Sequence, residues 1–154
     1  NMHIIHQITH HIDTRLVNSF ITLDYEGRYL RRKRLETAEG APFFVELPET
    51  KFVSDTDGFV LDDGRIIGIR SKLERLAKIT HPELPLIAWH IGNRHAPCQI
   101  ERDFLLIQEE HVLEEMLKTL GATVESIEGP FFPEGGAYSR RQQHSQESSS
   151  KHQT

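Results

Sequence analysis

Ten histidines are unusual in a 154-residue sequence, and His95 is the one best placed to do chemistry. It follows a segment, 82–93, in which apolar residues recur with the 3.6-residue period of an amphipathic helix. Gly92 and Asn93 tolerate left-handed backbone and predict the end of that helix. Pro97 favours extended backbone at the residue before it. His95 should therefore lie between a helix end and a strand, where its imidazole can bind a transition metal.

One imidazole cannot hold a divalent ion tightly, because transition metals usually take three or four protein ligands. A symmetric dimer would place two copies of His95 across its two-fold axis and supply half of these ligands. His144 and His152 are candidates for the others, or they are only solvated residues of the chain end. His90 lies on a different part of the helix surface from His95, so it is better interpreted as an exposed or hydrogen-bonded helix residue.

Four further features have competing interpretations. His111 starts a second predicted helix and is either a weak metal ligand or a surface residue. Cys98 alternates with Ile100 in a half-buried strand, which favours a small core residue. Trp89 is interpreted as a core residue or a dimer contact. The basic run 31–34 is either a solvated strand face or a docking patch for a partner.

The N-terminal half, 2–70, contains short apolar segments separated by turn residues, which is typical of a small β-sandwich or open barrel. A hairpin turn is predicted at 26–27 and a tight turn at 62–64. Another strand is predicted over 42–48, bounded by prolines. The histidines of this half are interpreted as structural: His3, His6, His10 and His11.

From residue 71 the pattern alternates strands with helices. The first helix begins at Pro82 or Pro85, and the second covers 109–120. The element order βαββαβ is that of the ferredoxin-like split unit. One apolar stripe of the second helix is predicted to be buried: Val112, Leu113, Met116, Leu117 and Leu120.

The sequence therefore predicts an α+β protein with a β-rich domain over 2–70 and a ferredoxin-like domain over 71–138. Residues 139–154 contain no apolar residue and are predicted to form a disordered tail. The net charge of −5 argues against nucleic-acid binding. No apolar run approaches the roughly 20 residues that span a bilayer, and no export leader is recognisable. With one cysteine, the sequence fits a cytoplasmic protein without disulfides.

No catalytic motif is present: there is no Gly-rich phosphate loop, no Gly-x-Ser-x-Gly and no His-Glu-x-x-His. A metal-dependent hydrolase would need a carboxylate ligand or a general base beside His95, and the sequence offers none there. The chain is therefore predicted not to be an enzyme.

Three segments of the chain form a recognisable set: His-Ile-Gly-Asn-Arg-His at 90–95, Glu-His-Val-Leu-Glu-Glu-Met-Leu at 110–117 and Gly-Pro-Phe-Phe-Pro-Glu-Gly-Gly-Ala-Tyr at 129–138. In order and spacing they resemble the signature segments of the UreE family of urease accessory proteins. The resemblance implies a nickel metallochaperone that delivers nickel during urease maturation, with zinc or copper as competing ions. It also implies a homodimer that binds nickel at its interface through His95.

The resemblance further implies contacts with the urease apoprotein and with accessory proteins including the GTPase UreG. The β-rich domain would correspond to one that resembles the peptide-binding domain of a J-protein chaperone. Two departures from the family pattern concern the metal ligands. Glu109 stands where relatives often have the first histidine of a His-x-His pair with His111, and the tail has His144 and His152 instead of a polyhistidine run. The alternative function is a general divalent-metal buffer without a dedicated client.

Overall fold

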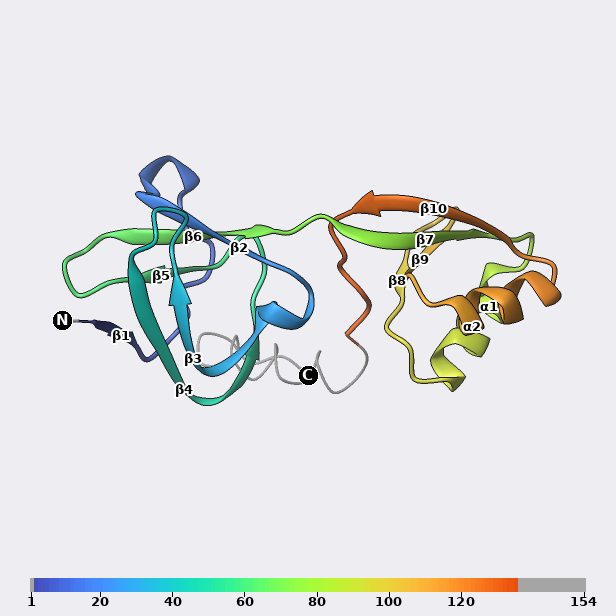
Figure 1. The fold of residues 1–154 in the computed structure, drawn as a ribbon, viewed down its shortest axis with the longest axis horizontal. Coiled ribbons are helices and arrows are strands. Elements are labelled where there is room, and N and C mark those ends of the chain that lie inside the picture. Colours follow the sequence, from blue (N-terminus) through green and yellow to red (C-terminus); the bar gives the residue numbers. More distant parts are fainter. Residues whose placement is uncertain (1, 136–154) are drawn as a thin grey trace, which may run out of the picture. The chain divides into compact units, whose positions relative to one another are not determined.

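The computed structural model describes residues 2–135, which divide into two compact units (Figure 1). The N-terminal unit comprises the chain up to Glu74 together with Glu128–Phe131. The C-terminal unit comprises Arg75–Ile127 together with residues 132–135. The protein is α+β, as predicted, with the helices in the C-terminal unit.

The N-terminal unit is built from two three-stranded sheets with the strand orders β1-β4-β3 and β2-β6-β5. Its strands are β1 (His3–Ile5), β2 (Ser19–Leu23), β3 (Tyr29–Glu36), β4 (Pro42–Phe52), β5 (Gly58–Val60) and β6 (Ile66–Ser71). Both sheets contribute apolar side chains to one core, as expected of a small β-sandwich. Fully buried members of this core include Leu30, Val45 and Phe59.

Two local predictions for this unit are wrong. Residues 26–27 do not form a hairpin turn; they belong to a 3-10 helix, η2 (Glu26–Arg28), which connects strands of different sheets. The Asp24 side chain stabilises this helix, because its Oδ1 accepts the Gly27 N–H at 2.7 Å. The strand predicted over 42–48 continues through Pro48 to Phe52. The β3–β4 register shifts between Leu30 and Arg32, so β4 accommodates a proline that lacks an N–H.

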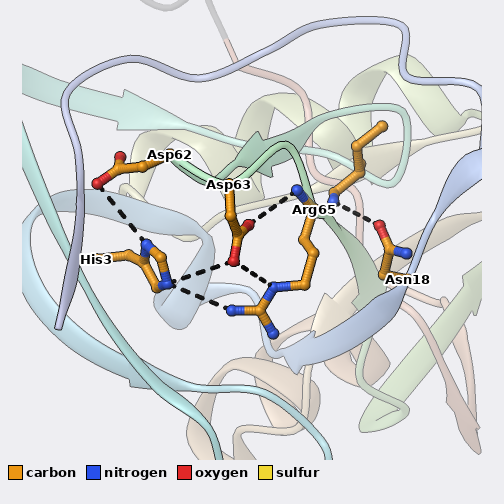
Figure 2. A network of polar contacts seen from close by, with 6 residues as sticks. His3, Asn18, Asp62, Asp63 and Arg65 are labelled. Atoms are coloured by element: carbon orange, nitrogen blue, oxygen red, sulfur yellow. Dashed lines mark hydrogen bonds and ion pairs between the residues drawn. The ribbon is translucent and has the colours of Figure 1, made fainter. Parts of the chain in front are cut away.

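A polar network ties the N-terminal strand to the turn before β6 (Figure 2). The His3 ring lies 3.8 Å from an Asp62 oxygen and 3.7 Å from an Asp63 oxygen. Arg65 Nε donates to Asp63 at 2.9 Å, and the Ile66 N–H donates to Asn18 Oδ1 at 2.8 Å. His10 makes a similar contact with the buried Asp57 at 2.8 Å. These contacts give His3 and His10 structural roles in the unit.

The C-terminal unit has one four-stranded sheet with the order β10-β7-β9-β8 and two helices. Its elements are β7 (Glu74–Thr80), α1 (Leu84–Asn93), β8 (Gln99–Ile100), β9 (Leu105–Gln108), α2 (His111–Thr119) and β10 (Thr123–Gly129). The element order βαββαβ with this strand order is the ferredoxin-like arrangement that the sequence predicted. Both helices lie on the same side of the sheet (Figure 1).

The two helices bury narrow stripes against the sheet. Ile87 and Ile91 of α1 join Leu113 and Leu117 of α2 in the core. The stripe predicted for α2 is too wide, because Val112 and Leu120 are exposed and only one side of the helix faces the sheet. Within residues 2–135 no helix is long and apolar enough to cross a membrane.

Candidate metal centre

The turn after α1 holds His95 in a backbone conformation that glycine usually adopts. The His95 N–H donates to the Gly92 carbonyl at 2.9 Å, and the Ala96 N–H donates to the Ile91 carbonyl at 3.3 Å. This pair of bonds is the Schellman motif, in which the residue after the C-cap is left-handed. His95 has a φ of 60°, whereas Gly92 does not have a positive φ. The left-handed residue is therefore the histidine itself, and not Gly92 or Asn93 as the sequence suggested.

A histidine at this position has a conformational cost. Left-handed backbone costs an L-residue roughly 1–2 kcal/mol, although histidine tolerates it better than most residues do. Strained positions of this kind concentrate at functional sites, where the side chain has a role that glycine cannot fill.

The His95 side chain is exposed and has no hydrogen-bond or ion-pair partner among residues 2–135. In the same part of the chain, no three His, Cys, Asp or Glu side chains gather into a group that could hold a metal ion. A complete set of protein ligands around His95 would therefore include residues of another copy of the chain or residues beyond 135.

The last described residues run beside the strand that follows His95. The Glu134 N–H donates to the Cys98 carbonyl at 2.7 Å, and the Phe132 N–H donates to Gln99 Oε1 at 2.8 Å. His144 and His152 lie outside the described residues. The described segment that precedes them in sequence contacts Cys98, which is three residues after His95. This contact could not be predicted from the sequence, because the paired residues are about 35 positions apart.

The environment of Cys98 disfavours the thiolate form of its side chain. Its side chain packs against the C-terminal core, and burial raises the pKa of the thiol to about 11. At pH 8 the thiolate fraction is then on the order of one in a thousand, compared with roughly a quarter for a free cysteine. The interpretation of Cys98 as a small core residue agrees with this environment.

We expect iodoacetamide to alkylate Cys98 at pH 8 at least about tenfold more slowly than it alkylates N-acetylcysteine, because the thiolate is the nucleophile. The rate should climb steadily between pH 8 and pH 10 as the thiolate fraction increases. Mass spectrometry of timed samples measures the alkylation rate of Cys98, and urea-unfolded protein serves as the control. A native-state rate equal to the unfolded rate would contradict the buried thiol.

The outer face of α1 is apolar and leads toward the His95 turn. Leu86 is 47% exposed and Trp89, one turn later, is 62% exposed. Trp89 is therefore not a core residue; its ring packs edge-on against the His90 ring, with centroids 5.1 Å apart. Large apolar side chains exposed together on one helix face commonly mark an interaction surface.

His111 is the first residue of α2 and is exposed. The neighbouring carboxylates are already engaged. Glu110 caps the helix by accepting the Leu113 N–H. Glu109 accepts hydrogen bonds from Arg75 and from Ser126, and these bonds lower its pKa. Glu115 lies one turn after His111 and pairs with Lys118 at 2.9 Å, so Lys118 competes for this potential second ligand. The assignment of His111 as a weak ligand stays a prediction.

A groove of about 470 Å³ separates the His95 turn from the start of α2. Its lining comes from three segments of the C-terminal unit: Arg94, Ala96 and Pro97; Ile107 and Gln108; Glu109, Glu110 and Leu113. Polar and apolar residues contribute equally to this lining, and His95 itself is not part of it.

Comparison with known proteins identifies the family. Residues 2–72 match the family described as UreE urease accessory protein, N-terminal domain, and residues 74–154 match its C-terminal domain. The urease accessory protein UreE of Rhodobacter capsulatus is 55% identical over 118 residues, which cover 77% of this chain and 75% of that protein. The Ruegeria pomeroyi protein of the same name is 48% identical over 124 residues, which cover 80% and 83%. This chain therefore belongs to the UreE family of urease accessory proteins.

Proposed function

We propose that this protein is a cytoplasmic nickel metallochaperone that delivers nickel during urease maturation and is not itself an enzyme. The observation that carries the proposal is His95: an exposed imidazole held left-handed at the end of α1, with no partner among residues 2–135. Membership of a family of urease accessory proteins supports urease as the client. Zinc and copper also accept imidazole ligands and would compete with nickel.

In this proposal the protein works as a homodimer that brings two copies of His95 to one ion. The exposed Leu86 and Trp89 on the outer face of α1 support this arrangement, because they provide apolar contact area close to the His95 turn. A symmetric pair would place the same two residues of each copy in the interface. Ligands shared between copies also agree with the lack of a complete metal-binding group within residues 2–135 of one copy.

The other ligands would come from His144 or His152, with His111 as a weak auxiliary ligand. Glu134 is held at Cys98, and about ten residues separate it from His144. An extended chain spans about 3.3–3.6 Å per residue, so this segment can cover some 30 Å. His144 is thus within reach of His95, and exchange between tail and turn ligands would let the ion leave for a client.

Removing residues 139–154 should weaken nickel binding but leave the thermal midpoint nearly unchanged, because a segment without apolar residues adds little to a core. Calorimetric nickel titration and thermal unfolding measure the two effects. The full-length variant His144→Ala/His152→Ala is the matched control, since it removes the imidazoles and keeps the tail. An unaltered isotherm in both proteins would remove these histidines from the ligand set.

The proposal is tested by titrating the protein with nickel and zinc while sedimentation equilibrium gives the mass of the complex. We expect one tightly held ion per two chains. A tight ion held by each chain in a monomeric protein would overturn the shared site.

The alternative is a metal buffer with no dedicated client. Contacts with the urease apoprotein and with accessory proteins, including the GTPase UreG, distinguish the two functions. A metallochaperone should raise the activity of nickel-depleted urease in the presence of those proteins when free nickel is chelated. A buffer would supply nickel no better than a small chelator of the same affinity.

A further inference from the structure

Strand β3 presents an unusual amount of positive charge on a sheet edge. The strand order β1-β4-β3 leaves β3 with a neighbour on one side only (Figure 1). Arg31, Arg32, Lys33 and Arg34 are consecutive in this strand, and all four are exposed. The chain as a whole has a net charge of −5, so the run contrasts with the overall charge.

Only half of this charge is compensated within the described part of the chain. Arg32 lies 3.9 Å from Glu46, and Arg34 pairs with Glu36 at 2.7 Å. Arg31 and Lys33 have no ion-pair partner among residues 2–135. The edge therefore keeps two unpaired cations that can meet carboxylates from outside.

An exposed aromatic side chain begins the same strand. Tyr29 is 41% exposed, and its ring packs on Phe52 with centroids 4.6 Å apart and on Tyr25 at 5.4 Å. A tyrosine that is held by neighbouring rings loses little conformational entropy on binding, and tyrosine is frequent among residues that dominate interface energies. Strand β3 thus begins with an aromatic side chain that can anchor a partner, and exposed cationic side chains follow it.

Charged side chains on an edge strand also have a protective role, because they prevent pairing with other sheet edges. The sign of the charge makes this protection selective. A second copy of β3 is repelled, whereas a strand with carboxylates is attracted, since opposite charges on adjacent strands stabilise pairing. Addition of an extended segment to an exposed edge is a common mode of peptide recognition.

We propose that β3 is a docking edge for an extended, acidic segment of a partner protein. The segment adds beside β3, its carboxylates meet Arg31 and Lys33, and an apolar side chain packs on Tyr29. This inference goes beyond the proposed nickel function and does not use His95, so each can fail without the other.

The test uses the full chain and a fluorescein-labelled peptide of alternating glutamate and valine, followed by fluorescence anisotropy at low and high NaCl. Arg31→Gln/Lys33→Gln should weaken binding at least tenfold at low salt, and Tyr29→Ser should also weaken it. The matched control is Arg15→Gln/Arg102→Gln, which removes two exposed cations elsewhere and should change the affinity less than twofold. Circular dichroism checks that each variant is folded.

A charge-reversed variant distinguishes loss of the specific charge contacts from a general loss of peptide affinity. Arg31→Glu/Lys33→Glu should lose the glutamate peptide and bind a peptide of alternating lysine and valine. Equal effects of the β3 variants and the control pair would overturn the proposal. Binding of a DNA duplex as tightly as the glutamate peptide, with the same sensitivity to Arg31 and Lys33, would also overturn it in favour of a general polyanion surface.

Discussion

Replacing His95 with glycine should abolish the proposed shared nickel site and leave the fold and the proposed homodimer intact. In a dimer the substitution deletes two imidazoles from one ion. Ligands that act jointly on an ion are far from additive, so we expect a loss of at least about 3 kcal/mol, or roughly a hundredfold in Kd. Nickel titration with sedimentation measurements checks both parts of this expectation.

Glycine is the informative substitution because His95 has a φ of 60°. Glycine adopts this conformation without the cost to a side chain, although it gains entropy in the unfolded chain. The stability of His95→Gly should therefore equal or exceed that of the parent by up to about 1 kcal/mol. His95→Ala has no such relief and should be less stable than His95→Gly by about the same amount.

The two variants separate metal binding from folding. Both should lose the nickel site, while their free energies of unfolding differ by up to about 1 kcal/mol. His90→Ala is the control on the same helix, and it should bind nickel nearly as well as the parent. A folded, dimeric His95→Gly protein with the same Kd for its tightest nickel ion as the parent would contradict the proposed site.

Features set by local periodicity could be predicted from the sequence. Ile87 and Ile91 recur with the helical period and are buried, and Leu113 and Leu117 behave in the same way. Trp89 lies two residues from both Ile87 and Ile91 and therefore off this stripe, so its exposure follows the same period, although its residue type favoured a core or contact position. Element order was enough for the ferredoxin-like topology, since few strand arrangements satisfy βαββαβ with short connections.

For the candidate site, the sequence located the turn but not its geometry. Gly92 and Asn93 indicated a helix end just before His95, and α1 does end at Asn93. Left-handed backbone at a histidine was not predictable, because that conformation usually selects glycine. The approach of Glu134 to Cys98 was also missed, since it depends on how the chain returns after β10.

The burial of Arg28 could not be predicted from the sequence either. Substitution of this residue is the second change for which we expect a large effect. Arg28 directly follows the turn predicted at 26–27, yet this residue is 0% exposed. Its Nη1 donates to Ser71 Oγ at 2.6 Å, and its Nη2 donates to the Phe131 carbonyl, 103 residues later in the chain. Burial lowers the pKa of the guanidinium, and the nearby Asp55 carboxylate opposes that effect. Only the folded chain brings these partners together.

Arg28→Ala should destabilise the N-terminal unit by about 3–5 kcal/mol, the usual cost of removing one partner from a buried charged network. The substitution leaves the Ser71 hydroxyl and the Phe131 carbonyl without this donor, and it opens a cavity beside Phe52, whose ring centre lies 5.4 Å from the guanidinium carbon. Since domains are stable by only about 5–15 kcal/mol, the variant should unfold at a much lower urea concentration.

The matched control is Arg15→Ala. The Arg15 side chain is 87% exposed and pairs with Asp13 on the surface, so its removal should change stability by less than about 0.5 kcal/mol. Urea unfolding followed by circular dichroism gives both values, and hydrogen exchange should show the Arg28→Ala effect in peptides from β2 to β6. Equal stability of the two variants would mean that the buried guanidinium does not hold Glu128–Phe131 to the unit, and that apolar packing around Phe131 is sufficient.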